Sequence, residues 1–272
     1  MVTFTNEKIS PRITRIRDGS DVCMYLVEGT NRAVLIDTGY GIGELKAYVD
    51  TLTDKPYEVY LTHGHVDHAS GAAQFPVVHM NQEDSALFLK HTTVEFRRQK
   101  LAAHTRLQLE DVDFQPQRTE PILPLVDGEV VELGGASLRW LHIPGHTAGT
   151  MVALLPEERT IFFGDACGVG NLLALPESLP VASYYKSLKK LQTFEPLYDT
   201  VLRQHGACRS TPRVLEDNIE NCERIMAGTD DKVPAECAGI PCLRACKVDP
   251  TTGARLDGRE GNILYDKDRI YE

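Results

Sequence analysis

The chain has 272 residues, of which 42% are hydrophobic and 25% are charged. These are the proportions of an ordinary globular protein, with enough apolar residues for a sizeable core in one large domain or two small ones. The 39 acidic residues outnumber the 29 basic ones, and the resulting net charge of -10 disfavours broad binding to the phosphates of nucleic acids.

The N-terminal segment, residues 1–19, contains no apolar stretch of the kind found in a secretory signal peptide. The chain has no run of about 18 apolar residues, so no membrane helix is expected. Its seven cysteines are an odd number, which without an export signal favours reduced thiols. We therefore expect a cytoplasmic protein that does not associate with membranes.

The first eighty residues predict several strands with one short helix. Residues 21–28 and 33–37 are rich in β-forming residues and are separated by Gly29, Thr30 and Asn31, which is typical of a hairpin. Residues 58–62 and 76–80 are further short strand candidates. A short helix is expected between the second and third strands, at 43–52.

The remaining chain returns twice from helix to strand. Residues 81–120 are long and charged and favour one or two helices inserted between strands, followed by an irregular, proline-rich segment at 115–124. The tail from 228 to 272 is rich in proline, glycine and cysteine and is expected to be irregular, apart from a last strand. A sheet core flanked by helices is the natural packing for this order. The other expected elements are strands at 129–133, 137–143, 151–155, 160–163, 200–203 and 262–265, and helices at 183–194 and 212–226.

The segment from Thr62 to His68 reads THGHVDH and places four metal-ligand side chains within six residues: His63, His65, Asp67 and His68. A strand is predicted to end at Thr62, and Gly64 allows the backbone to turn sharply after it. Imidazole and carboxylate groups are ligands that zinc and iron accept. Because one ion needs three or four protein ligands, this loop alone cannot complete a pair of metal sites.

Three later residues are candidates for the missing ligands. His146 lies in IPGHTAG, Asp165 in FFGDA and His205 in RQHG. Each follows a predicted strand and stands beside a glycine, so each would project from a turn at a strand end.

With these pieces in place, the sequence resembles the metallo-β-lactamase-fold superfamily. The matching pieces are LIDTG at 35–39, THGHVDH, PGHTAG, FFGDA and RQHG, and the likeness covers roughly residues 20–225. The resemblance implies an α/β fold, a four-layer αβ/βα sandwich with the metals at one edge of the paired sheets. It further implies that residues 1–272 form one such domain.

The resemblance also implies the roles of the site residues. It assigns His63, His65 and His146 to one metal, Asp67, His68 and His205 to a second, and Asp165 to both. Two divalent ions are expected, zinc first, with iron or manganese as alternatives. A hydroxide between the metals would be the nucleophile, since a bound metal lowers the pKa of water towards about 7.

Two carboxylates receive further roles in this scheme. Asp67 would also carry a proton to the leaving group. Asp37, in LIDTG, is expected to accept the second N–H of a ligand histidine and so fix its orientation; the alternative is a turn residue that caps the next segment.

Other candidate residues are expected to be structural. His79 and His142 alternate with apolar strand residues and should be packed and hydrogen bonded. His91, His104, Arg97, Arg98 and Lys100 fall in the helical insertion, where solvated helix faces are favoured over contact with an anionic substrate. Cys167 is expected to be a small buried hydrophobe, and the tail cysteines lack the paired spacing typical of a zinc site.

The function that this pattern favours is metal-dependent hydrolysis of a small ester, thioester, lactone or amide. Asp165 stands where lactamases with a cysteine ligand would have Cys, and His65 stands where redox members of the superfamily have Glu, so both classes are disfavoured. A mono-iron oxygenase of the persulfide dioxygenase type, using His63, His146 and Asp165, and a phosphodiesterase remain alternatives. The expected partner is a small-molecule substrate, and the sequence leaves homodimerisation open.

Overall fold

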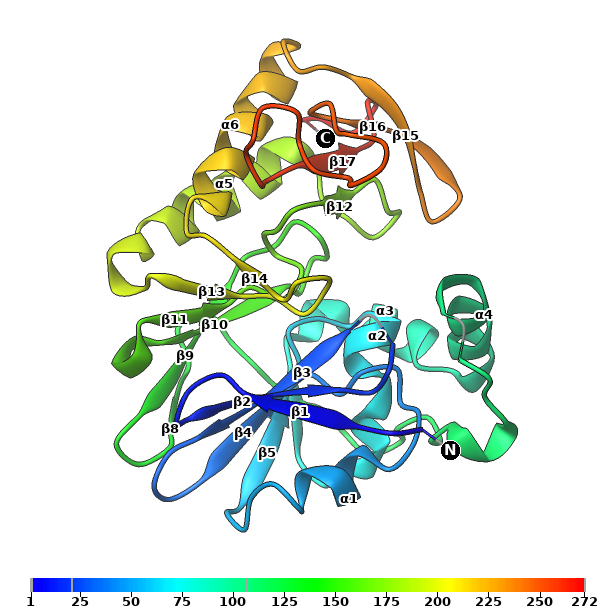
Figure 1. Ribbon diagram of the computed structural model, residues 1–272, viewed down its shortest axis with the longest axis vertical. Helices are drawn as coiled ribbons and strands as arrows, with labels where there is room; N and C mark the ends of the chain where they lie inside the picture. Colours follow the sequence, from blue (N-terminus) through cyan, green and yellow to red (C-terminus); the bar gives the residue numbers. More distant parts are fainter. Residues whose placement is uncertain (1, 21, 106, 272) are drawn as a thin grey trace. The chain divides into compact units, whose positions relative to one another are not determined.

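The computed structural model describes residues 2–20, 22–105 and 107–271, and its contacts divide the chain into two compact units. Unit 1 is the chain up to Trp140 together with Gln204–Cys208. Unit 2 is Leu141–Arg203 together with Arg209–Glu272. Each unit contains β-sheet with helices packed against it (Figure 1). That residues 1–272 form a single domain stays a prediction.

Unit 1 is built on a seven-stranded sheet whose strands follow one another in chain order. The first four strands are antiparallel to their neighbours, and the last three are added in parallel. The predicted hairpin is confirmed, because Glu28 pairs with Ala33. The strands are β1 (Thr5–Lys8), β2 (Ile13–Arg17), β3 (Cys23–Glu28), β4 (Ala33–Ile36), β5 (Tyr57–Tyr60), β6 (Val78–Met80) and β7 (Leu123–Pro124).

The central strands of this sheet are covered on both faces. Every residue of β4 is buried, and β3 is buried from Cys23 to Val27. Unbroken apolar runs such as AVLI are typical of strands that have no face in contact with water. Residue 21, which begins the range expected for β3, lies outside the described residues.

The helices of unit 1 supply the other half of its core. Leu45 and Val49 of α1 (Leu45–Val49), Ala69 of α2 (Val66–Ala69) and Phe88 of α3 (Ser85–His91) pack with buried residues of the sheet. The predicted helical insertion is confirmed, since α3 is followed by α4 (Val94–His104). Strands β8 (Val130–Glu132) and β9 (Ser137–His142) form a further antiparallel pair. The boundary between the two units falls within β9, after Trp140.

Unit 2 contains two groups of hydrogen-bonded strands. The first has the order β14-β13-β11-β10, with the β11 and β13 strands parallel. The second has the order β12-β17-β16-β15. The strands are β10 (Met151–Leu155), β11 (Thr160–Phe162), β12 (Asn171–Leu173), β13 (Thr200–Leu202), β14 (Arg209–Ser210), β15 (Val233–Cys237), β16 (Ile240–Arg244) and β17 (Ile263–Tyr265).

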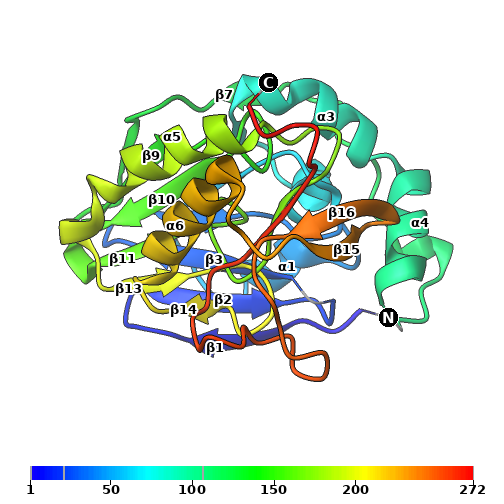
Figure 2. The same cartoon turned by 90° about the horizontal axis from the view of Figure 1, so that it is seen from above.

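Two amphipathic helices cover unit 2, as the sequence predicts. In Figure 2, α5 (Val181–Gln192) and α6 (Val214–Ala227) lie over strands β10, β11 and β13. Leu188 and Leu191 of α5 and Ile219 of α6 are buried in the same core cluster as Val201. The second helix ends at Gly228, whose φ of 70° is the left-handed conformation that commonly terminates helices.

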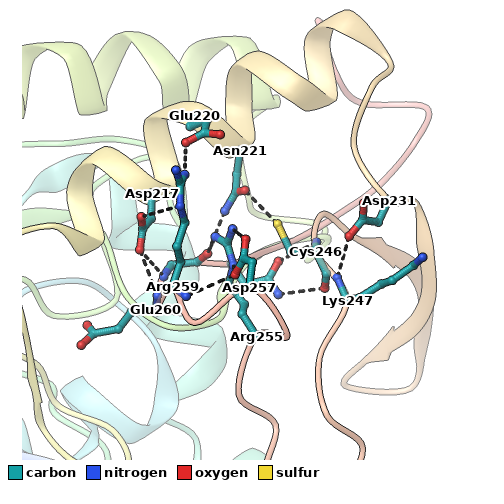
Figure 3. Close-up of polar contacts among 12 residues, drawn as sticks. Asp217, Glu220, Asn221, Asp231, Cys246, Lys247, Arg255, Asp257, Arg259 and Glu260 are labelled. Carbon is teal, nitrogen blue, oxygen red and sulfur yellow. Dashed lines mark hydrogen bonds and ion pairs between the residues drawn. The ribbon is translucent and has the colours of Figure 1, made fainter.

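The tail of unit 2 differs from its prediction as an irregular segment. Strands β15 and β16 form a hairpin between Val233 and Arg244, and only the chain after it is a long loop. That loop is attached to α6 by polar contacts (Figure 3). Asp217 accepts from the backbone N–H groups of Glu260 and Gly261 at 2.9 and 3.2 Å, and Arg259 pairs with Glu220.

Among the residues that the structure describes, no helix is long and apolar enough to cross a lipid bilayer.

The proline-rich segment of unit 1, expected to be irregular, is held in place by one buried arginine. Arg118 is 5% exposed, and its guanidinium donates hydrogen bonds to five backbone carbonyl groups. Burial lowers the pKa of this arginine, and it remains a cation at neutral pH. The accepting carbonyls belong to Ala72, Phe75, Pro76, Glu120 and Pro121.

We expect Arg118→Leu to lower the free energy of unfolding by about 3 kcal/mol, because it leaves buried carbonyl groups without donors. Urea denaturation measures this change. The matched control is Arg139→Leu, at an exposed position of β9, where an effect below about 0.5 kcal/mol is expected. Equal losses in the two variants would contradict the anchoring role of Arg118.

Candidate metal centre

The predicted ligand loop of unit 1 lies between β5 and α2. His63 and His65 occupy the turn, and Asp67 and His68 are on the short helix that follows. The three histidines are buried. Gly64 packs closely against Asp84: its N–H donates to Asp84 Oδ2 at 2.8 Å, and a Cβ atom would lie in a tight contact, 3.1 Å from the Asp84 Cβ and backbone oxygen.

A single carboxylate organises the side chains around this loop. Asp37 is fully buried, directly after β4, and has the positive φ of 63° that few non-glycine residues adopt. Its oxygens accept from the Thr62 N–H and hydroxyl, from His68 Nδ1 at 2.9 Å and from Gln204 Nε2 at 3.1 Å. Four donors fill the acceptor capacity of a carboxylate. The expected contact between Asp37 and a histidine of the ligand set is therefore present.

These contacts determine where the histidine protons are. Asp37 only accepts, so His68 carries its proton on Nδ1. The Thr62 hydroxyl donates its one hydrogen to Asp37, so the Thr62 oxygen, 3.0 Å from His63 Nδ1, accepts a hydrogen bond from the N–H at that nitrogen. In both rings the Nε2 atom is left with its lone pair, which is the form that binds a metal ion.

Three ligand atoms of unit 1 have the spacing of a tetrahedral metal site. His68 Nε2 lies 3.2 Å from His205 Nε2, and Asp67 Oδ2 lies 3.3 Å from His205 Nε2 and 3.8 Å from His68 Nε2. Ligands bound tetrahedrally at the usual zinc distances are about 3.3 Å apart. The lone pair of His68 Nε2, the Asp67 carboxylate and the His205 imidazole are groups that bind divalent metals, and at these separations they fit one ion.

A second pair of imidazoles in unit 1 has a similar spacing. His63 Nε2 is 3.0 Å from His65 Nδ1, and the two rings stand at 80° to one another. His63 presents its Nε2 lone pair here, and the separation of the two nitrogens is close to that of two ligands of one ion. Unit 1 therefore brings together all five of its predicted ligands.

Unit 2 brings together the other two predicted ligands. His146 Nε2 lies 3.5 Å from Asp165 Oδ2, after β9 and β11 respectively. His146 Nδ1 donates to the backbone oxygen of Leu172 in β12 at 3.0 Å, so its Nε2 atom also carries a lone pair. Ser178 donates to the backbone oxygen of His146 at 2.8 Å and holds this turn in place.

The solvated helix faces expected for His91 and Arg97 are a wrong prediction, because both side chains are buried, and the His91 ring stacks on that of His65. The other residues expected to be structural have structural contacts. His79 contacts Glu58 at 3.0 Å, and His142 Nε2 donates to the Ala148 oxygen at 2.7 Å. Arg97 is fully buried and binds the oxygens of Gly41 and Gln115 instead of facing a substrate. Arg98 forms an ion pair with Asp111, and Cys167 is fully buried. The side chain of His104 lies outside the described residues.

Sequence reasoning missed three residues that support the ligands. Gln204 directly precedes His205 and donates to Asp37, while Asp84 fixes the turn at Gly64. Thr62 was treated only as the end of a strand. Of the three, Gln204 had the best sequence signal, since it is a polar residue directly before a predicted ligand, but that signal did not identify Asp37 as its partner.

Comparison with known proteins identifies the class. The family model of the metallo-beta-lactamase superfamily matches residues 17–205, a span that contains every predicted ligand. The chain belongs to this superfamily. Its fold is the predicted metallo-β-lactamase fold: a metallo-beta-lactamase from Pontibacter korlensis superposes with a TM-score of 0.59 at 19% identity, over 80% of this chain and 98% of that one.

Two similar curated proteins carry names of thioesterases. The acyl-coenzyme A thioesterase MBLAC2 of Bos taurus is 25% identical over 189 residues, which is 64% of this chain and 68% of that protein. The atrochrysone carboxyl ACP thioesterase nsrC of Aspergillus novofumigatus is 29% identical over 199 residues, 69% of this chain. The second match spans only about half of the fungal protein, 52% of its length.

We expect Asp37→Asn to weaken metal binding by about 10–100-fold, since the amide cannot accept all four hydrogen bonds and the His68 ring loses its fixed orientation. Asparagine tolerates the left-handed backbone at this position, which limits the effect on folding. Competition with a chromogenic chelator measures the affinity.

The control is Asp18→Asn, which changes another buried carboxylate of unit 1 that is hydrogen bonded to Ser20. Its metal affinity should stay unchanged. If Asp37→Asn lowered only the stability, Asp37 would be the turn residue of the alternative interpretation.

Proposed function

We propose that this protein is a metal-dependent hydrolase that cleaves thioesters with the help of two divalent ions, zinc being expected. The observation that carries the proposal is the trio of Asp67, His68 and His205, whose ligand atoms have the separations of a tetrahedral site. The buried Asp37 beside the trio supplies the orientation that metal-binding histidines usually receive from a carboxylate.

The proposed ligand sets follow the superfamily pattern. Asp67, His68 and His205 would hold one ion, His63, His65 and His146 the other, and Asp165 would be shared. The proton positions derived for His63, His68 and His146 support this assignment, since each ring presents Nε2. When bound, such ions polarise a carbonyl oxygen and make hydroxide available at neutral pH.

A thioester is the proposed substrate for two reasons. The curated relatives described above are named thioesterases, although neither match extends over the whole relative. A thiol has a pKa near 8.5, far below that of an alcohol, so a thiolate leaves with little help from a general acid. Asp67, whose side chain is 18% exposed, is the group we propose to carry a proton towards the departing sulfur.

The mono-iron alternative leaves three residues without a role. An oxygenase built on His63, His146 and Asp165 needs neither Asp67, His68 nor His205 as ligands. Yet these three side chains approach one another, and His68 is oriented by a buried carboxylate. The approach of these three side chains and the orientation of His68 favour a site for a second ion, and a site with two ions favours hydrolysis.

We expect the protein purified without chelator to contain about two divalent ions per chain and to release free thiol from an acyl-coenzyme A. Plasma emission spectroscopy gives the metal content, and a thiol-reactive chromogen follows hydrolysis. The same preparation is tested with a lactone, with a bis-aryl phosphodiester and, in an oxygen electrode, with a persulfide. One iron per chain with oxygen uptake would overturn the proposal, as would cleavage of the phosphodiester alone.

His205→Gln should weaken binding of the ion assigned to Asp67, His68 and His205. The loss in affinity should exceed that caused by losing a supporting hydrogen bond, which is about 10–100-fold. Thioester hydrolysis should fall with it, because the residual protein holds a single ion. The control is His79→Gln, which changes a half-buried histidine of unit 1 that pairs with Glu58 and stacks on Tyr60. Its metal content should stay at two; two ions in the His205 variant as well would remove this histidine from the ligand set.

Unit 2 contains a pocket that suits the anionic part of such a substrate. Its volume is about 210 Å³, and its lining includes Val169 and Leu264 as apolar walls and Arg244 as a cation. Among the described residues, no ion pair involves Arg244. The pocket also contains Gly170, two residues before Leu172, whose backbone oxygen accepts from His146. Since two residues span at most about 7 Å, the pocket wall is close to a proposed ligand.

We expect Arg244→Gln to raise the KM for a phosphate-bearing thioester such as an acyl-coenzyme A by about 10-fold, the loss of one charge-assisted hydrogen bond. The KM for an uncharged short-chain thioester should stay unchanged, and steady-state kinetics compare the two. Lys186→Gln, on the exposed face of α5, is the control for net charge. Equal changes with both substrates would mean that Arg244 does not recognise the anion.

A further inference from the structure

Two cysteines that are far apart in the sequence meet inside unit 1. Cys23 opens β3, and Cys208 ends the short segment that returns to this unit from residue 204. Their sulfur atoms are 3.0 Å apart, although 185 positions separate them in the chain. A disulfide bond needs about 2.05 Å, so the two sulfurs have to approach by only about 1 Å to form one.

The surroundings of the pair make its two sulfurs unequal. The hydrogen bond from Cys23 and the positive charges of Arg17 and Arg15 hold the pKa of Cys208 below its ordinary value, against the effect of burial. Arg17 Nη2 lies 3.1 Å from Cys208 Sγ. Burial raises the pKa of Cys23. Because the Arg17 guanidinium lies against Cys208, a thiolate charge is best compensated on this sulfur, and we assign Cys208 as the sulfur that attacks first and Cys23 as its partner in the disulfide.

The pair is also linked to the proposed ligand His205. The Cys208 N–H donates to the His205 oxygen at 3.0 Å, and the Cys23 N–H donates to the Gln204 oxygen at 2.8 Å. The residue before Cys23, Val22, forms an isolated β-bridge with His205 itself. A change in the distance between the two sulfurs therefore acts on the four-residue turn from His205 to Cys208.

The turn beside the pair is exposed at its two middle residues. Both sulfur-bearing side chains are fully buried, whereas Gly206 and Ala207 are exposed to solvent. Cys208 has a φ of 54°, a left-handed conformation that strains a non-glycine residue. A strained, exposed turn opens locally more readily than the core of a sheet, and a small oxidant needs no larger opening.

We propose that Cys23 and Cys208 form a modification site, at which a hydroperoxide oxidises the two thiols to a disulfide and thereby alters the position of His205. The effect on metal binding rests on the function proposed above; the oxidation itself does not. Because the disulfide draws the 205–208 turn towards β3, the ligand atom of His205 is displaced from the spacing it has with His68 and Asp67.

The proposed reaction balances with the hydroperoxide as the only oxidant. The Cys208 thiolate attacks one peroxide oxygen, the O–O bond breaks, and the departing alkoxide or hydroxide takes up a proton. The resulting sulfenic acid is attacked by the Cys23 sulfur, the S–O bond breaks, and the oxygen leaves as water with the Cys23 proton. Two thiols are oxidised to one disulfide, and the hydroperoxide is reduced to an alcohol or to water.

The first test is covalent and uses the full chain without metal and with zinc. Each sample is treated with hydrogen peroxide, the remaining thiols are alkylated under denaturing conditions, and the protein is digested without reduction. Mass spectrometry should find the peptides of Cys23 and Cys208 linked, and dithiothreitol should separate them. If both cysteines were recovered alkylated, or linked to other cysteines, the proposal would be overturned whatever the metal content.

The variants Cys23→Ser and Cys208→Ser should each prevent this link. The control is Cys242→Ser, which removes a half-buried thiol of β16 in unit 2 and should leave the link intact. Because the wild-type protein already decides whether the disulfide forms, a variant that does not fold does not affect the result.

The second test measures zinc affinity before and after peroxide with a chromogenic chelator. The oxidised wild type should bind its second ion about 10-fold or more weakly, by analogy with other losses of ligand orientation, and dithiothreitol should restore the affinity. Cys23→Ser should show no such change. A disulfide that formed without altering zinc affinity would refute the link to His205, while a protein that bound no zinc in either state would refute the proposed function instead.

Discussion

The structure of unit 1 depends on one buried negative charge. The Asp37 carboxylate is removed from water, which is costly unless every acceptor position is occupied by a donor. Its donors come from Thr62 and His68, on the loop after β5, and from Gln204, in the segment that returns to unit 1 much later in the chain. Folding this unit and orienting the candidate ligands are therefore the same event, because the contacts that satisfy the charge also fix the imidazoles.

The local part of the site could be predicted because its information is local. His63, His65, Asp67 and His68 lie on one turn and one short helix, so their proximity follows from the sequence alone. The buried strands were equally plain, since β4 is an uninterrupted apolar run and the hairpin before it has a clear turn signal. For His146, Asp165 and His205 the glycines beside them gave the position of each turn, whereas the family resemblance gave their roles.

What could not be predicted depends on pairing between distant segments. Nothing in the neighbourhood of Gln204 or Cys208 indicates that they contact Asp37 and Cys23. The β15–β16 hairpin was missed because it contains two prolines. The structure shows why they are tolerated: Pro234 is on the outermost strand of its sheet, and Pro241 is outside the part of β16 that pairs with β17.

The return of residues 204–208 to unit 1 has a consequence for synthesis on the ribosome. The chain of this unit is interrupted after Trp140, and its last piece is made only after the 63 residues from Leu141 to Arg203 have followed. At about 5–20 residues per second, the nascent protein spends several seconds with Asp37 lacking one of its donors and Cys23 lacking its neighbour. A fragment that ends at residue 140 lacks Gln204–Cys208 and would stay in that incomplete state. If the protein is expressed as two fragments divided after residue 140, the first therefore needs the second to complete unit 1.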